Sequence, residues 1–111
     1  MKFIIALLLI ASPISMAKSI YDKSISDASS ISESLAINAI ESFVWGYGRS
    51  ASVSGCASIG DNKLDENFPS RMIADQTWVY LKYNANQEHS LIGVLMSYIP
   101  KAYPCKKEEA N

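Results

Sequence analysis

Apolar residues recur at helical spacing along three segments of the chain, and these segments predict most of the fold. The first segment begins at Ser30, where Ser30 and Glu33 form the capping-box pattern of a helix N-terminus. Apolar residues then follow three or four positions apart, and most of the positions between them are polar. We expect one long helix whose apolar positions are Ile31, Leu35, Ala36, Ala39, Ile40, Phe43, Val44, Tyr47 and Ala51.

Two further helices are predicted in the second half of the chain. Pro69 suits the first position of the second helix, and Asn84 suits its C-terminus. The predicted apolar face of this helix is Met72, Ile73, Val79, Tyr80, Leu81 and Tyr83, with Trp78 part-buried at its edge. After a polar connection, residues 85–90, a third helix has its apolar positions at Leu91, Ile92, Val94, Leu95, Tyr98 and Ile99. Pro100 is expected to kink or end it.

The stretches between these helices contain no convincing strand, because no apolar–polar alternation of period two is long enough. Residues 57–68 form the longest irregular stretch and are rich in turn-forming Gly, Asp and Asn. Gly46 and Gly48 interrupt the first helix, which favours close approach of another helix, a kink, or a backbone that contacts a ligand. The predicted fold class is all-α, a small bundle of about three to four helices clipped by one disulfide.

The N-terminal segment predicts the compartment. Lys2 is followed by an unbroken apolar run, a proline and small residues before Lys18, which is the layout of a secretory signal peptide over residues 1–17. The run is too short to span a bilayer, so we expect cleavage and a periplasmic product without membrane insertion. Residues 18–29 are then a flexible leader or an early helical turn, residues 30–105 the helical domain, and residues 106–111 a charged tail.

The two cysteines fit export to an oxidising compartment. Cys56 and Cys105 are an even pair without metal-site spacing, and they predict one disulfide. A loop of this length should stabilise the fold by about 4 kcal/mol. A metal pair and a catalytic thiol are the alternatives for these two residues.

Charge and catalytic residues exclude several functions. The chain has 10 basic and 11 acidic residues, and loss of Lys2 with the signal peptide makes the mature domain slightly more acidic. This balance argues against nucleic-acid partners and anionic membranes. His89, the only histidine, lies in a polar connection, and residues 61–72 fail the calcium-loop pattern because of Lys63, Glu66 and Met72. We therefore expect no enzyme activity, no cofactor and no metal site.

The aromatic residues are numerous for so small a domain. They are Trp45, Tyr47, Trp78, Tyr80, Tyr83, Tyr98 and Tyr103. Most are expected in the core, because a small core needs large side chains. One or two beside the acidic loop would form a binding surface, since Tyr and Trp combine a large apolar area with a polar group.

A run of these features resembles a known family. Phe43-Val44-Trp45-Gly46-Tyr47-Gly48 precedes Cys56, a helix carries Trp78-Val79-Tyr80-Leu81, and a Leu95…Tyr98-Ile99 helix leads to Tyr103-Pro104-Cys105. This arrangement resembles the Tai/Rap-type periplasmic immunity proteins, which neutralise peptidoglycan amidase toxins of the type VI secretion system. The resemblance implies a homodimeric helical inhibitor that inserts loops into the substrate groove of a toxin hydrolase.

By loop position, the candidate partner-binding residues lie in two places. The long loop offers Asp61, Asn62, Asp65 and Glu66, and the short connection offers Asn86, Glu88 and His89. Two other functions stay open. One is a small periplasmic stress chaperone or client-binding helical protein. The other is a subunit or assembly factor of an envelope complex that packs on the Gly/Ser/Ala face of the first helix.

Overall fold

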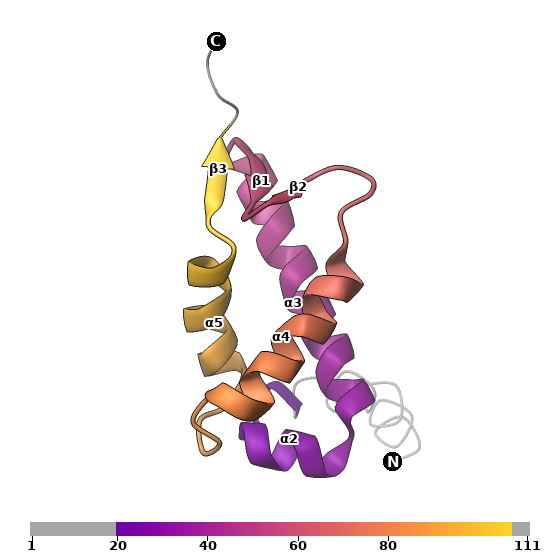
Figure 1. Ribbon diagram of the computed structural model, residues 1–111, viewed down its shortest axis with the longest axis vertical. Helices are drawn as coiled ribbons and strands as arrows, with labels where there is room; N and C mark the ends of the chain where they lie inside the picture. Colours follow the sequence, from indigo (N-terminus) through magenta and orange to yellow (C-terminus); the bar gives the residue numbers. More distant parts are fainter. Residues whose placement is uncertain (1–19, 108–111) are drawn as a thin grey trace, which may run out of the picture.

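The computed structural model describes residues 20–107, in which helices pack around one long central helix (Figure 1). The helices are α2 (Ile25–Ile31), α3 (Glu33–Val53), α4 (Ser70–Asn84) and α5 (Leu91–Ala102). The strands are β1 (Cys56–Ile59), β2 (Asn62–Lys63) and β3 (Cys105–Lys107). α3 contacts α2, α4, α5 and β1, and it is therefore the framework of the fold.

The first long helix begins later than predicted, because a separate short helix, α2, precedes it. The predicted N-cap at Ser30 is wrong, because Ser30 lies inside α2 and Ser32 caps α3. Ser32 has an extended backbone that ends α2, and its hydroxyl accepts a hydrogen bond from the Leu35 N–H at 3.3 Å. Residues 18 and 19 of the predicted leader lie outside the described residues, and from Ile25 onward the leader forms α2. Ile25 and Ala28 fix it because both are fully buried.

The predicted apolar face of α4 is confirmed only at Ile73 and Leu81, which are buried. The buried residues of this helix are Ser70, Ile73, Ala74, Thr77, Trp78 and Leu81, which recur at helical spacing. Met72, Val79, Tyr80 and Tyr83, which were expected on that face, are exposed. Trp78 decides the orientation, because its large ring is only 1% exposed and its indole N–H donates to Glu33 at 3.0 Å. The prediction that Trp78 lies part-buried at the edge is therefore wrong.

α5 agrees more closely with the sequence pattern. Ser90 caps it by accepting a hydrogen bond from the Gly93 N–H at 3.2 Å, and Leu91, Leu95 and Ile99 are buried. Pro100 lies in the last turn, and the helix continues only to Ala102. Pro69 is the N-cap of α4 rather than its first residue, and Asn84 is the last residue of that helix.

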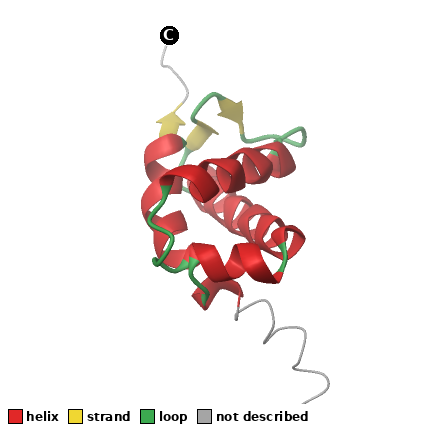
Figure 2. Cartoon of the chain, turned by 60° about the horizontal axis from the view of Figure 1, so that its bottom comes forward, coloured by secondary structure: helices red, strands yellow, loops and turns green. Residues whose placement is uncertain are grey.

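The described residues also contain a small sheet, so the all-α prediction needs correction. The strand order is β2-β1-β3 and both pairings are antiparallel. Figure 2 shows these strands together at one end of the helices. Strands of two to four residues are too short to produce a visible alternation in the sequence. The long irregular stretch is thus a tight hairpin followed by a shorter loop, with Gly60 at positive φ in the turn.

The disulfide is confirmed. Cys56 and Cys105 are bonded, and they join β1 to β3. Tyr47 reinforces this end from α3, because its hydroxyl donates to the Tyr103 carbonyl at 2.7 Å. The predicted signal peptide lies outside the described residues, and Lys106 and Lys107 of the predicted tail belong to β3. Within residues 20–107 no helix is both long and apolar enough to cross a membrane.

Candidate protein-binding site

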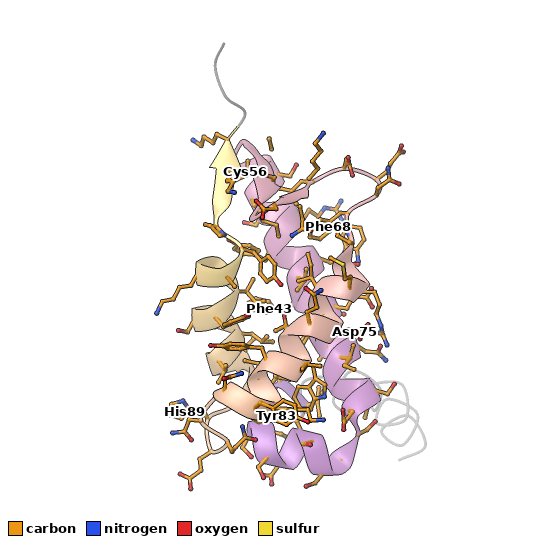
Figure 3. All side chains as sticks on the ribbon, viewed as in Figure 1. Phe43, Cys56, Phe68, Asp75, Tyr83 and His89 are labelled. Carbon is orange, nitrogen blue, oxygen red and sulfur yellow. A yellow bond between two sulfur atoms is a disulfide. The ribbon has the colours of Figure 1, made fainter. Side chains whose placement is uncertain are left out.

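The seven predicted partner-binding residues do not form one surface. Asp61, Asn62, Asp65 and Glu66 lie in or after the hairpin, at the end of the molecule that carries the disulfide. The connection of residues 85–90 lies at the opposite end of α4 and α5, where Figure 3 labels His89, far from Cys56. One partner surface would therefore use one of these two groups rather than both.

The connection between α4 and α5 mainly supports α2. The carbonyl groups of His89 and Gln87 accept hydrogen bonds from the backbone N–H groups of Ile25 and Ser26, at 3.0 and 3.1 Å. The Asn86 side chain accepts from the Glu88 N–H at 2.9 Å, which shapes the turn. Asn86 thus has a structural role, while the Glu88 and His89 side chains are exposed to solvent.

Within the other group, most polar contacts stay inside the loop. Asp61 pairs with Lys106 at 3.0 Å, and the Asn62 amide reaches the Ile59 carbonyl at 3.5 Å. Asp65 accepts a hydrogen bond from the Asn67 N–H at 2.9 Å, and Glu66 is exposed. The Asp65–Asn67 bond shapes the turn beside the apolar residues of the loop, whereas the exposed Asp61–Lys106 pair adds little stability.

A groove of about 210 Å³ lies where this loop meets α3. Its walls are predominantly apolar, and its polar groups are few. The lining residues are Trp45, Gly48, Arg49, Ser52, Leu64, Asp65 and Phe68. Trp45, Gly48, Arg49 and Ser52 recur at helical spacing, so α3 supplies one continuous wall and the segment of residues 64–68 supplies the other.

Gly48 allows the two walls to meet. A Cβ atom at this position would lie 3.2 Å from Leu64 Cδ2 and 3.5 Å from the Phe68 ring. The predicted close approach is therefore real, but a loop makes it rather than another helix. A Cβ atom at Gly46 would meet no other segment within 4 Å, so the packing does not require a glycine there.

Trp45 is the exposed aromatic residue of this groove. Its side chain packs edge-on against Phe68, with ring centroids 5.8 Å apart and planes at 70°, yet the residue is 50% exposed. Phe68 is 8% exposed and therefore supports the Trp45 ring from within the fold. Trp45 thus agrees with the expectation that a surplus aromatic residue lies beside the acidic loop, and its role in binding stays a prediction.

Arg49 supplies an available positive charge beside Trp45. It is exposed, and it forms no ion pair with any residue in the range 20–107. The other wall carries Asp65, whose carboxylate accepts from the loop backbone. The groove therefore combines an apolar floor with one charge of each sign at its rim.

None of the groups with clearly shifted pKa values within residues 20–107 lines this groove. Hydrogen bonds from Trp78 and Lys82 lower the pKa of Glu33, and partial burial raises the pKa of the Tyr47 hydroxyl. No three His, Cys, Asp or Glu residues come close enough to hold a metal ion in the part of the chain the structure describes. The groove offers shape and apolar contact area for binding.

Sequence reasoning found Trp45 and Asp65 but missed Arg49, Leu64 and Phe68. The small-residue run around Gly48 signals close packing, but the sequence does not say which segment packs there. Comparison with known proteins adds no relative, because no family model, curated protein or solved structure matches the chain.

Proposed function

We propose that this chain is a periplasmic, non-enzymatic inhibitor of the immunity type that binds and blocks a peptidoglycan amidase toxin. The observation that carries this proposal is Trp45, half-exposed on a rigid helix and fixed by Phe68 beside a groove. Residues of this kind dominate the binding energy of many protein interfaces, because a large rigid side chain buries much area at little entropic cost.

The architecture around Trp45 favours a rigid inhibitory surface. The disulfide, the Tyr47–Tyr103 hydrogen bond and the short sheet all lie at the same end as the groove. A preorganised surface loses little conformational entropy on binding, which favours tight inhibition. The predicted signal peptide would deliver the protein to the compartment in which such a toxin acts.

The test is inhibition of purified type VI amidase effectors that degrade isolated peptidoglycan. We expect the mature chain, with its disulfide intact, to block one such enzyme at equimolar concentration. Trp45→Ala should weaken inhibition about thirtyfold, the equivalent of about 2 kcal/mol at a binding hot spot. Tyr83→Ala is the matched control, because Tyr83 is also an exposed aromatic residue and does not line the groove.

The result that would contradict the proposal is full activity of every such amidase in the presence of the wild-type protein. The chaperone alternative makes a different prediction, namely that the chain suppresses aggregation of unrelated unfolded proteins at acid pH. Exposed Met72, Val79 and Tyr83 on α4, together with Met96 on α5, are the apolar residues that would serve that role. Tyr83→Ala would then be the damaging variant and Trp45→Ala the neutral one.

A further inference from the structure

We propose that the groove between α3 and residues 64–68 takes one apolar side chain of a protein partner, and that Arg49 pairs with an acidic residue next to it. The inference rests on the proposed function, since it specifies what part of the partner this chain recognises. It assigns the groove to a short exposed segment of a protein rather than to a small-molecule ligand.

The size of the groove selects this occupant. Pockets for drug-sized ligands or cofactors usually measure about 300–1,000 Å³, whereas this groove measures about 210 Å³. An apolar cavity of about 150 Å³ can hold a benzene ring. The groove therefore has room for one leucine or phenylalanine side chain, with the partner backbone remaining outside.

The walls of the groove are held in position before any partner arrives. The Leu64 N–H donates to the Ala57 carbonyl at 3.0 Å, and the Phe68 N–H donates to the Asp65 carbonyl at 3.1 Å. The opposite wall is a helix in which Gly48 leaves space for both side chains. A side chain entering this site would replace solvent at Trp45, Leu64 and Phe68 without requiring the loop to refold.

The charges of Arg49 and Asp65 at the rim of the groove favour an acidic partner residue beside that apolar side chain. Several cations within residues 20–107 form no ion pair, and Arg49 is the one among them that lines the groove. A guanidinium group presents several N–H donors that match a carboxylate. Asp65, on the other wall, repels an acidic group placed on its side, so the two rim charges orient the partner segment.

The experiment uses the mature chain with its disulfide intact and three N-acetylated, C-amidated tetrapeptides followed by NMR. The probes are Gly-Leu-Glu-Gly, Gly-Leu-Lys-Gly and Gly-Ser-Glu-Gly. We expect saturable shifts of the Trp45 indole N–H and the Gly48 amide with the leucine peptides and little shift with the serine peptide. The Leu-Glu peptide should bind about threefold more tightly than the Leu-Lys peptide, a ratio typical of an exposed ion pair.

Two substitutions separate the apolar and the charged parts of the proposal. Arg49→Glu should reverse the preference, so that the Leu-Lys peptide binds more tightly. Trp45→Ala should weaken both leucine peptides about tenfold, while Tyr83→Ala leaves them unchanged. An unaltered preference in Arg49→Glu would overturn the role of Arg49, and wild-type shifts located away from Trp45 and Gly48 would overturn the groove as the site.

The remaining outcomes keep this inference separate from the proposed function. Concentration-dependent shifts of the same groove signals without peptide would show that a second copy of the chain occupies it, which overturns the assignment to a partner. Inhibition of an amidase without any peptide response at the groove would overturn the inference and leave the function standing. A charge-dependent peptide response without inhibition of any amidase would support the recognition mode and reject the toxin.

Discussion

The chain has two polar connections at opposite ends of its helices, and each end is stabilised in its own way. At the disulfide end, a covalent bond, a short sheet and the Tyr47–Tyr103 hydrogen bond hold the hairpin, and the apolar groove remains exposed. At the other end, the backbone of residues 85–90 is used to hold α2. Exposed polar residues therefore do not by themselves indicate a binding loop. The backbone hydrogen bonds of residues 85–90 show that this connection has a structural role.

The disulfide end should show the largest effect when its crosslink is removed. Replacing both Cys56 and Cys105 by alanine should lower the free energy of unfolding by about 4 kcal/mol, because the denatured chain regains the entropy of a long loop. Denaturant titration measures this loss directly. The double alanine variant is compared with the wild type under reducing conditions, and the two should unfold alike. A wild-type protein equally stable with and without reductant would contradict this contribution of the disulfide.

At the other end, Gln87 should matter more than its exposed neighbours. Its side-chain amide donates to the carbonyls of Leu81, Lys82 and Ala85 at 3.2, 3.2 and 2.9 Å, and these carbonyls lie at the end of α4. Gln87→Ala should lower the free energy of unfolding by about 1–2 kcal/mol, because the Lys82 and Ala85 carbonyls lose their side-chain donor, whereas the Leu81 carbonyl keeps the Ala85 N–H at 3.2 Å. Thermal unfolding measures the change, with Glu88→Ala as the control. Equal losses in the two variants would contradict the capping role of Gln87.

The two glycines of α3 test how the groove wall is built. Gly46→Ala should raise the free energy of unfolding by about 0.5–1 kcal/mol, since alanine is the better helix former and its Cβ meets no neighbour. Gly48→Ala should gain little or lose stability, because its Cβ meets Leu64 at 3.2 Å. Denaturant midpoints measure both variants. A similar gain for both would show that the loop of residues 64–68 moves easily away from α3.

The positions of the helices could be predicted from the sequence better than the residues through which they pack. Periodicity located α3, α4 and α5, but four of the six residues that it placed on the apolar face of α4 are exposed. Val79 and Tyr80 are larger than Ala74, yet Ala74 lies on the face that Trp78 and Leu81 bury, and these two large side chains determine the packing. The strands are too short to give a pattern, and the groove joins Gly48 to residues more than a dozen positions away, which only the folded chain brings together.

The smallest expected effect concerns pH and the end opposite the disulfide. Glu33 accepts hydrogen bonds from the Trp78 indole at 3.0 Å and from Lys82 at 3.1 Å, and these bonds lower its pKa in the folded protein. A lowered carboxyl pKa means that the stabilisation is complete above the unfolded value and is lost as pH falls through the folded value. The melting temperature of the wild type should therefore fall as pH drops below about 4.5.

Glu33→Gln isolates this contribution, because the amide keeps the shape of the side chain and does not titrate. The variant should melt at a lower temperature than the wild type at neutral pH, and the difference should shrink as the pH falls. Such a response would assign part of the acid sensitivity to the contacts that Glu33 of α3 makes with α4, away from the groove. A difference that stays constant from neutral to acid pH would mean that the charge of Glu33 does not stabilise the fold.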